Sequence, residues 1–236
     1  MDLLDTTREA FRLLFSGDPA LWGIVWVSLK VSVLALILAG PLAVVLGFLL
    51  AHIAFPGRRL LVILVQAFQS FPTVVVGLLL YLLLSRQGPL GALHLLFTQP
   101  AMILGQMVIA FPVLAAYTLT AVQGADPRAY ETASSLGAGR VRAAMTTLWE
   151  VRFGVMAAVF VGFGRIVSEI GCSLMVGGNI AGLTRNIPTA IALETSKGEF
   201  AQGVALGIVL MVLALAVNVV LAAVQGQGGM SRAWQP

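Results

Sequence analysis

Arg165 and Glu169 are the charged residues that lie deepest inside an apolar segment of the chain. They are four positions apart, so in a helix they share one face and can form an ion pair. Charged side chains inside a membrane are costly and usually face the helix bundle or a water-filled cavity. Two interpretations stay open: the pair attracts an anion in a pathway or gate, or it only fixes helix packing.

The other residue types argue against enzyme chemistry. The chain has no Gly-x-x-x-x-Gly-Lys-Ser/Thr loop and no pattern of a nucleophile with its base, so we expect it not to be an enzyme. Its one cysteine, Cys172, excludes an internal disulfide, and His52 and His94 stand far apart without a carboxylate cluster. We therefore expect no metal site and no cofactor held by this chain. If ATP is used, another polypeptide must hydrolyse it.

The composition indicates an all-α integral membrane protein. Of the 236 residues, 59% are hydrophobic and 10% are charged, and four stretches without any charged residue cover more than half the chain. About 20 apolar residues suffice to cross the hydrocarbon core as a helix. The net charge of +4 includes no basic run, so we expect contact with membrane lipid and none with nucleic acid. The pattern predicts five transmembrane helices, at about 28–54, 60–84, 101–123, 153–177 and 201–224.

The basic residues orient these spans. Arg58 and Arg59 follow the first span, four arginines lie between the third and the fourth, and Arg232 lies in the C-terminal tail. Since short cytoplasmic loops are rich in Lys and Arg, we place these segments in the cytoplasm and the N-terminus outside. The loop 126–152 is then cytoplasmic, and the loop 178–199 is external.

Two further features concern the shape of the helices. Apolar residues at helical spacing up to Phe15 predict a short helix at the membrane surface, which Ser16-Gly17-Asp18-Pro19 stops. Prolines inside the first three spans are expected to bend them, because proline removes a backbone hydrogen bond. They are Pro41, Pro72 and Pro112.

The cytoplasmic loop 126–152 is predicted to fold into two short helices. Asp126 suits the cap of the first helix, Pro127 its first position, and Gly137 the residue after its end. The second helix is expected to begin after Gly139. Such a loop is either a docking knob for another protein or a solvated amphipathic segment. As a knob, Tyr130 and Leu136 would be its anchors, and Ala133 would permit close approach.

The same loop carries a family resemblance. Glu131-Thr132-Ala133, followed after three residues by Gly137, resembles the Glu-Ala-Ala-x-x-x-Gly loop of ABC-importer permeases. The resemblance implies coupling helices that dock into a groove of an ATPase subunit. The family pattern continues with Ile-x-Leu-Pro, where this chain has Thr147-Leu148-Trp149-Glu150. Without that proline, we expect the second short helix to run more smoothly into the fourth span.

A second stretch, in the external loop, narrows the resemblance. Gly178-Asn179-Ile180, Gly182, Thr184-Arg185, Pro188 and Ala190-Ile191 resemble the outer loop of molybdate and tungstate permeases. Its continuation through 192–198 is most similar to the tungstate subfamily. Within this loop, Asn186 and Pro188 suit a helix start and Gly198 a helix stop. Asn179, Thr184 and Arg185 join Arg165 and Glu169 as candidates for a pathway or gate, although Arg185 suits a plain surface charge equally well.

The resemblance implies a single transmembrane permease domain, residues 1–236, in the cytoplasmic membrane of a bacterium or archaeon. Two copies would form one pathway as a homodimer, and a pair of ABC ATPase subunits would bind ATP and Mg²⁺. A periplasmic or lipid-anchored binding protein would deliver a tetrahedral oxyanion, with tungstate expected first and molybdate or another oxyanion as the alternative. A secondary anion carrier or channel is the alternative from a different class. It would need intramembrane titratable groups and a doubled core.

Overall fold

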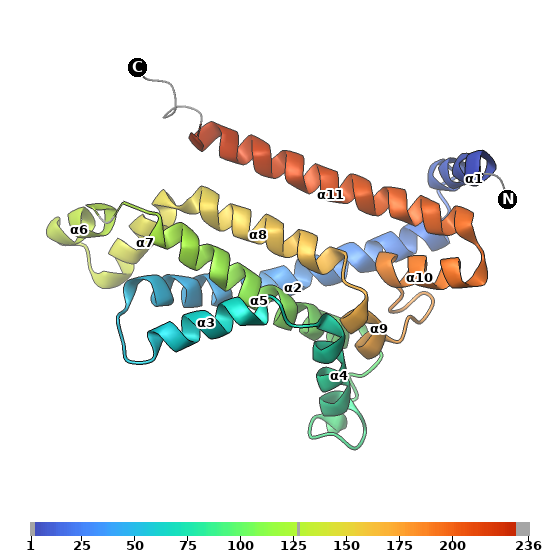
Figure 1. The fold of residues 1–236 in the computed structure, drawn as a ribbon, viewed down its shortest axis with the longest axis horizontal. Coiled ribbons are helices and arrows are strands. Elements are labelled where there is room, and N and C mark those ends of the chain that lie inside the picture. Colours follow the sequence, from blue (N-terminus) through green and yellow to red (C-terminus); the bar gives the residue numbers. More distant parts are fainter. Residues whose placement is uncertain (1–2, 127, 230–236) are drawn as a thin grey trace.

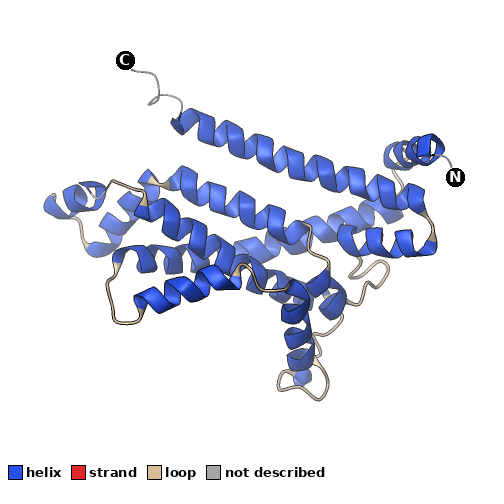
Figure 2. Cartoon of the chain, in the orientation of Figure 1, coloured by secondary structure: helices blue, strands red, loops and turns tan. Residues whose placement is uncertain are grey.

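The computed structural model describes residues 3–126 and 128–229. In these ranges the chain consists of helices and loops, without a strand (Figure 2). The elements are α1 (Leu3–Phe15), α2 (Pro19–His52), α3 (Arg58–Phe68), α4 (Thr73–Leu84), the 3-10 turn η1 (Gly91–Leu93), α5 (Gln99–Gln123), α6 (Arg128–Ser135), α7 (Arg140–Glu150), α8 (Arg152–Val167), α9 (Gly171–Gly177), α10 (Ile187–Lys197) and α11 (Phe200–Gly229). The expected all-α class is confirmed.

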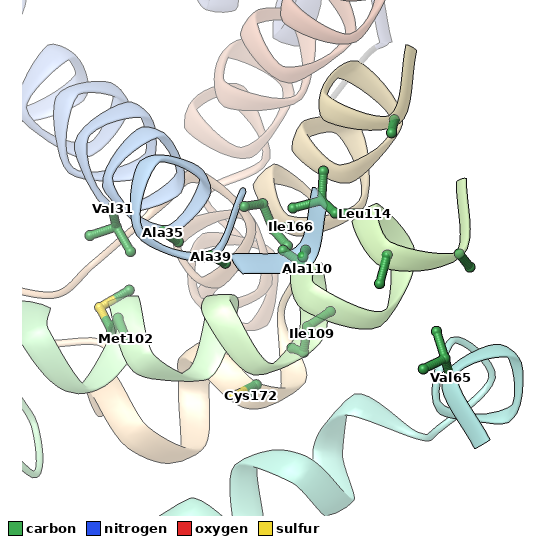
Figure 3. Packing of buried hydrophobic residues seen from close by; sticks show 14 of the residues in the cluster. Val31, Ala35, Ala39, Val65, Met102, Ile109, Ala110, Leu114, Ile166 and Cys172 are labelled. Atoms are coloured by element: carbon green, nitrogen blue, oxygen red, sulfur yellow. The ribbon is translucent and has the colours of Figure 1, made fainter. Parts of the chain in front are cut away.

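Helix α5 is the centre of the bundle, because α2, α3, α4, α8 and α9 all pack against it. Small and medium apolar residues from these helices fill the core (Figure 3). Glycines let the helices approach closely: a Cβ on Gly47 of α2 would lie 2.6 Å from the carbonyl oxygen of Ala115. A Cβ on Gly154 of α8 would lie 2.6 Å from the Cβ of Ala121. Close packing of this kind stabilises helix association in a membrane, where the hydrophobic effect between helices is absent.

We expect Gly47→Ala to lower the thermal stability of the purified protein. The added methyl group would collide with the backbone of α5, and overpacking of a well-packed core costs about 1–3 kcal/mol. Gly40→Ala is the matched control, because Gly40 lies in the same helix and nothing is within 4 Å of its Cβ position. Alanine is also the better helix former, so the control should be neutral or slightly stabilising. Equal melting temperatures of both variants in a detergent thermal-shift assay would contradict this account of α2–α5 packing.

Two of the expected spans are broken. The bend at Pro72 within 60–84 is confirmed as a full break, whereas the break within 153–177 was not expected. The second span consists of α3 and α4, which meet at an angle of 99°. Pro72 precedes α4, and because it has no N–H it cannot continue the hydrogen bonding of α3. The fourth consists of α8 and α9, bent by 61° at Ser168–Ile170 without any proline.

The remaining spans are continuous. Three helices are long and apolar enough to cross a membrane, and the number rises to five if each bent pair counts as one span. The described part of the chain is therefore consistent with five spans without fixing that number. Helix α2, which forms the first span, starts at Pro19 rather than near 28, because the Asp18 side chain accepts a hydrogen bond from the Ala20 N–H at 3.0 Å and caps it. Pro41 and Pro112 lie within unbroken helices, so of the three prolines only Pro72 marks a break.

The two ends of the bundle carry different segments (Figure 1). Helices α1, α9 and α10 lie toward one end, and α6, α7 and the last turns of α11 lie toward the other. The predicted short N-terminal helix is confirmed as α1, which packs on α11 through a cluster that includes Ala10 and Leu206. Its position at the membrane surface stays a prediction. The loops 126–152 and 178–199 lie toward opposite ends of the bundle (Figure 1), as expected if the chain crosses the membrane once between them. Arg232 of the C-terminal tail lies outside the described residues.

We expect cysteines at Leu136 and Leu183, each introduced into a Cys172→Ala background, to react from opposite sides of the membrane. Both positions are accessible, with 83% and 46% of the residue exposed, whereas Thr184 beside Leu183 is fully buried. A membrane-impermeant maleimide applied to right-side-out and inverted vesicles measures the sidedness. Reaction of both cysteines in the same vesicle orientation would contradict the topology.

Candidate functional site

The two charged residues predicted to lie inside the membrane, Arg165 and Glu169, lie at the break between α8 and α9. An Arg165 Nη1 hydrogen donates to Glu169 Oε2 at 3.2 Å, which confirms the expected pairing. The other carboxylate oxygen, Oε1, accepts the backbone N–H of Cys172 at 3.1 Å in the first turn of α9. The Glu169 side chain is 4% exposed, and that of Arg165 is 38% exposed. Glu169 therefore connects Arg165 to the start of α9, while part of the Arg165 side chain stays exposed.

A polar residue of α5 supports the same break, and sequence reasoning did not find it. Gln106 is 1% exposed, and its Nε2 donates to the carbonyl oxygen of Ile166 at 3.2 Å. That carbonyl lies in the last turn of α8 and also accepts the Glu169 N–H at 3.2 Å, so Gln106 supplies an additional donor where the chain leaves the helix. The sequence feature that could have indicated Gln106 is its amide side chain within a long uncharged segment, because a buried polar group in a membrane needs a hydrogen-bond partner.

Arg165 faces a pocket at the bend between α3 and α4. The pocket has a volume of about 270 Å³, and apolar side chains of α3, α4 and α5 form most of its wall. Gln69 and Thr73 are its uncharged polar residues, and Arg165 is the charged one. In a low-dielectric wall the field of a single guanidinium acts more strongly than in water. The arrangement can attract an anion, and Glu169 offsets part of that attraction.

The 178–199 loop is held by its own side chains. Thr184, which is fully buried, donates its hydroxyl to the carbonyl oxygen of Gly177 at 2.6 Å and accepts the Ile180 N–H at 2.9 Å. Asn179 has a left-handed backbone with φ +52°, and its Nδ2 donates to the carbonyl oxygen of Thr189 at 3.3 Å. Both residues therefore shape the loop from within. Whether they also contact a transported ion stays a prediction.

Arg185 belongs to a small charge network on α10. Its Nη1 lies 3.9 Å from Glu194 Oε1, and Lys197 Nζ lies 3.1 Å from the same oxygen. The Asn186 side chain accepts the Thr189 N–H and caps α10, and Gly198 ends the helix with φ +82°, so the expected start and stop are confirmed. Because Glu194 partly neutralises Arg185, this cation is less available to an incoming anion than the sequence suggests.

The 126–152 loop forms the two predicted helices, α6 and α7. The Asp126 side chain accepts the Arg128 N–H at 3.0 Å, as expected for a cap, while Pro127 lies outside the described residues. Gly137 has φ +85°, and the Ala138 N–H donates to the carbonyl oxygen of Ala133 at 3.0 Å. Together with the bond from Gly137 N–H to Ser134, this is a Schellman motif that ends α6.

The candidate anchors of this loop differ in exposure. Leu136 is 83% exposed and available to a partner, Glu131 is exposed, and Ala133 is half-buried. Tyr130 is half-buried, and its ring lies 4.8 Å from that of His52, so it fastens α6 to the end of α2.

Sequence reasoning missed an apolar face on α7. Val141, Met145 and Trp149 follow one another at four-residue spacing and are 77%, 66% and 70% exposed. Ala143 and Thr147 on the other side of α7 are buried. Only Val151 separates α7 from α8, but its φ of −91° and ψ of 13° are not helical, so the two helices follow each other directly without forming one continuous helix. Whether the passage is smoother than in the family stays a prediction.

Within residues 3–126 and 128–229, no group of three or more His, Cys, Asp or Glu side chains is placed to hold a metal ion.

Comparisons with known proteins identify relatives along most of the chain. A family model described as "Binding-protein-dependent transport system inner membrane component" matches residues 43–226. The tungstate uptake system permease protein TupB of Campylobacter jejuni is 38% identical over 216 residues, which are 92% of this chain and 90% of that protein. A probable anion ABC transporter permease protein of Haloferax volcanii is 39% identical, over 81% of this chain and 85% of its own length. The molybdenum transport system permease protein ModB of Escherichia coli is 33% identical, over 77% and 83% of the two chains.

A solved structure shares the fold. A chain of a bacterial alginate ABC transporter, in complex with an alginate-bound periplasmic protein, superposes with a TM-score of 0.72. The match covers 90% of this chain and 80% of that chain at 20% identity. At this identity the likeness concerns the arrangement of the helices.

Proposed function

The chain belongs to the family of binding-protein-dependent transport system inner membrane components, and from this premise we propose that it is the permease subunit of an ATP-driven tungstate importer. The observation that carries the proposal is the similarity to tungstate uptake permeases over nearly the whole chain. Molybdate is the alternative substrate, because a molybdenum transport permease is also similar and the two oxyanions share charge and shape. The permease itself is not an enzyme in this assignment, and ATP and Mg²⁺ are bound by a separate ATPase subunit.

The cytoplasmic helix pair supports the docking of that ATPase. The Schellman motif at Gly137 and the contact between Tyr130 and His52 fix α6 relative to the bundle, while Leu136 points a large apolar side chain outward. The exposed face of α7 lies on the next helix, and α8 follows this helix after a single residue. A push on α6 and α7 would therefore move α8 and, through it, the Arg165–Glu169 break. This connection is how ATP hydrolysis on the partner would open the pathway.

The charged pocket supports an anion pathway. The Arg165 side chain is partly exposed and lines the pocket at the α3–α4 bend, and its ion pair with Glu169 holds the guanidinium in place. A guanidinium binds oxyanions through a planar array of N–H donors. We propose that Arg165 contacts or steers the oxyanion as it passes the bend, and that Glu169 positions it.

The exposed apolar helices support a second copy of this chain as partner. Helix α4 leaves the bundle to one side (Figure 1) and exposes Val74, Leu78, Leu79 and Leu82. Apolar faces of this size are covered by lipid or by protein. We propose that α3 and α4 of two copies face each other around one pathway, in the cytoplasmic membrane of a bacterium or archaeon. An external binding protein would deliver the oxyanion to the loops at the α10 end.

Reconstitution tests the assignment. Vesicles that contain the permease and its ATPase, with the tungstate-loaded binding protein outside, should accumulate tungsten only when ATP is present inside. Tungsten is counted by elemental mass spectrometry, and molybdate and sulfate serve as competitors. Uptake without ATP, driven by an ion gradient, would instead favour a secondary carrier.

A further inference from the structure

A second pocket, with a more polar wall, lies on the external side, in the loop between α4 and α5. It has a volume of about 710 Å³ and is lined by residues of the last turn of α4 and of the segment 85–97. Tyr81, Ser85, Arg86, Gln87 and His94 supply the polar part of its wall. The loop lies against α9, since the Phe97 N–H donates to the carbonyl oxygen of Val176 at 2.8 Å. Just after it, Gln99 Nε2 donates to the carbonyl oxygen of Leu183 in the 178–199 loop at 2.7 Å. These contacts place the pocket on the same side of the membrane as α10.

Arg86 is an arginine on the external side whose charge has no ion-pair partner among the described residues. In the ranges 3–126 and 128–229, neither the Arg86 nor the His94 side chain forms a hydrogen bond or an ion pair, and no carboxylate lines the pocket. Most other external cations have acidic neighbours: Arg185 and Lys197 pair with Glu194, and Arg8 and Arg12 line a hollow with Asp5 and Glu9. Lys30 keeps its charge but is held by a hydrogen bond to the Gln99 amide, away from this pocket's lining. An anion that reaches this face meets an uncompensated positive charge at Arg86.

The backbone of the pocket is held in an unusual shape. His94 and Phe97 have left-handed conformations, with φ +49° and +63°, which residues other than glycine seldom adopt. Each of them donates its backbone N–H, His94 to the carbonyl oxygen of Gly91 at 3.1 Å and Phe97 to that of Val176 at 2.8 Å. Strain of this kind concentrates at functional sites, where the surrounding structure imposes it.

The pocket is also connected to the intramembrane charge pair. Phe97 packs over Gly178, where an added Cβ would lie 2.7 Å from Phe97 Cδ1, and its N–H bonds to Val176 in α9. In the first turn of α9, the Cys172 N–H donates to the Glu169 carboxylate, which also pairs with Arg165. A short rigid helix therefore lies between the two cationic pockets.

We infer that the pocket around Arg86 is a receiving site for the free tetrahedral oxyanion, which it occupies between its release from the binding protein and its passage to Arg165. Arg86 supplies the charge, and the amide of Gln87 and the imidazole of His94 supply N–H donors in either protonation state of the ring. The pocket is wide enough for the ion to keep part of its water, so occupancy is brief and the site steers more than it traps. This inference rests on the proposed function, since it assigns a step of the same import.

Arg86→Gln tests the site in reconstituted vesicles with saturating tungstate-loaded binding protein. The maximal uptake rate should fall roughly tenfold, the worth of one charge-assisted hydrogen bond. The concentration of binding protein that gives half the maximal rate should stay unchanged, because the site takes the ion and not the protein. Arg86→Lys should keep most of the rate. Arg12→Gln, which removes one positive charge from α1 on the same side, is the control and should transport normally.

Three results would overturn the inference. The first is a normal rate for Arg86→Gln. The second is a raised half-saturating concentration of binding protein at a normal maximal rate, which would make Arg86 a docking residue for that protein. The third is loss of assembly with the ATPase for both Arg86→Gln and Arg86→Lys, which would make the residue structural. Absence of tungstate uptake by the unmodified complex would instead contradict the proposed function itself.

Discussion

Gly137→Val is expected to abolish co-purification of the ATPase with the permease and to stop ATP-driven uptake. Gly137 has φ +85° in the Schellman motif that ends α6, and a left-handed conformation costs an ordinary residue roughly 1–2 kcal/mol and a β-branched one more. This cost alone would reduce the population of the closed motif about tenfold. The chain would leave α6 in another direction, and Leu136 would no longer point toward the partner.

The matched control is Gly139→Ala, two residues further along. Gly139 has φ −63°, and nothing lies within 4 Å of the position of its Cβ, so alanine fits without strain. Both variants should reach the membrane in normal amounts, because the bundle does not depend on the α6–α7 turn. The measurement is the amount of ATPase retained on the tagged permease, with ATPase activity of the eluted complex as a second readout. Equal retention by the two variants would remove the turn from the docking surface.

Glu169→Ala should be the most harmful change inside the membrane. It removes the partner of Arg165 and leaves the Cys172 N–H at the start of α9 without its acceptor. Loss of one partner of a buried pair costs about 3–5 kcal/mol, and the lower end applies here because Arg165 is 38% exposed. We expect a low yield of assembled protein and little uptake. Glu199→Ala, which removes an exposed carboxylate beside α11, is the control and should have little effect.

Glu169→Gln separates the two contacts of the carboxylate. The amide oxygen still accepts the Cys172 N–H, so α9 keeps its start, while the charge that holds Arg165 is gone. We expect near-normal assembly with strongly reduced uptake per assembled transporter. The double variant Arg165→Gln/Glu169→Gln should assemble as well and transport as poorly, because the anion then meets no positive charge at the bend. Normal uptake by the double variant would make the pair a packing device only.

The sequence predicted several helix caps and stops better than the interiors of the long apolar spans. Caps and stops depend on a few local residues, and Asp126, Gly137, Asn186 and Gly198 all lie where their types indicated. The breaks in the second and fourth spans did not follow from apolar composition, because an apolar segment is equally apolar whether straight or bent. Pro72 offered a clue to the first break, but Pro41 and Pro112 carry the same clue within unbroken helices.

The candidate site was predicted in part. The four-residue spacing of Arg165 and Glu169 predicted their ion pair. Glu169 lies beyond the end of α8, however, and its contact with the Cys172 N–H depends on how α9 folds. Gln106 could not be assigned, because its partner Ile166 is 60 positions away and carries no polar side chain. The burial of Thr184 and the compensation of Arg185 by Glu194 likewise depend on contacts that only the folded loop provides.

The sharp turn between α3 and α4 constrains how the protein is made. At 1.5 Å per residue, the 11 and 12 residues of these helices give segments of about 17 and 18 Å, and neither alone crosses a hydrocarbon core of about 30 Å. Their main partners come later in the chain: α3 packs on α5, and α4 packs chiefly on α9. As the ribosome delivers the chain, α4 is complete nearly 90 residues before α9 exists. The pair must therefore enter the bilayer provisionally and take its final angle only after the fourth span has been inserted.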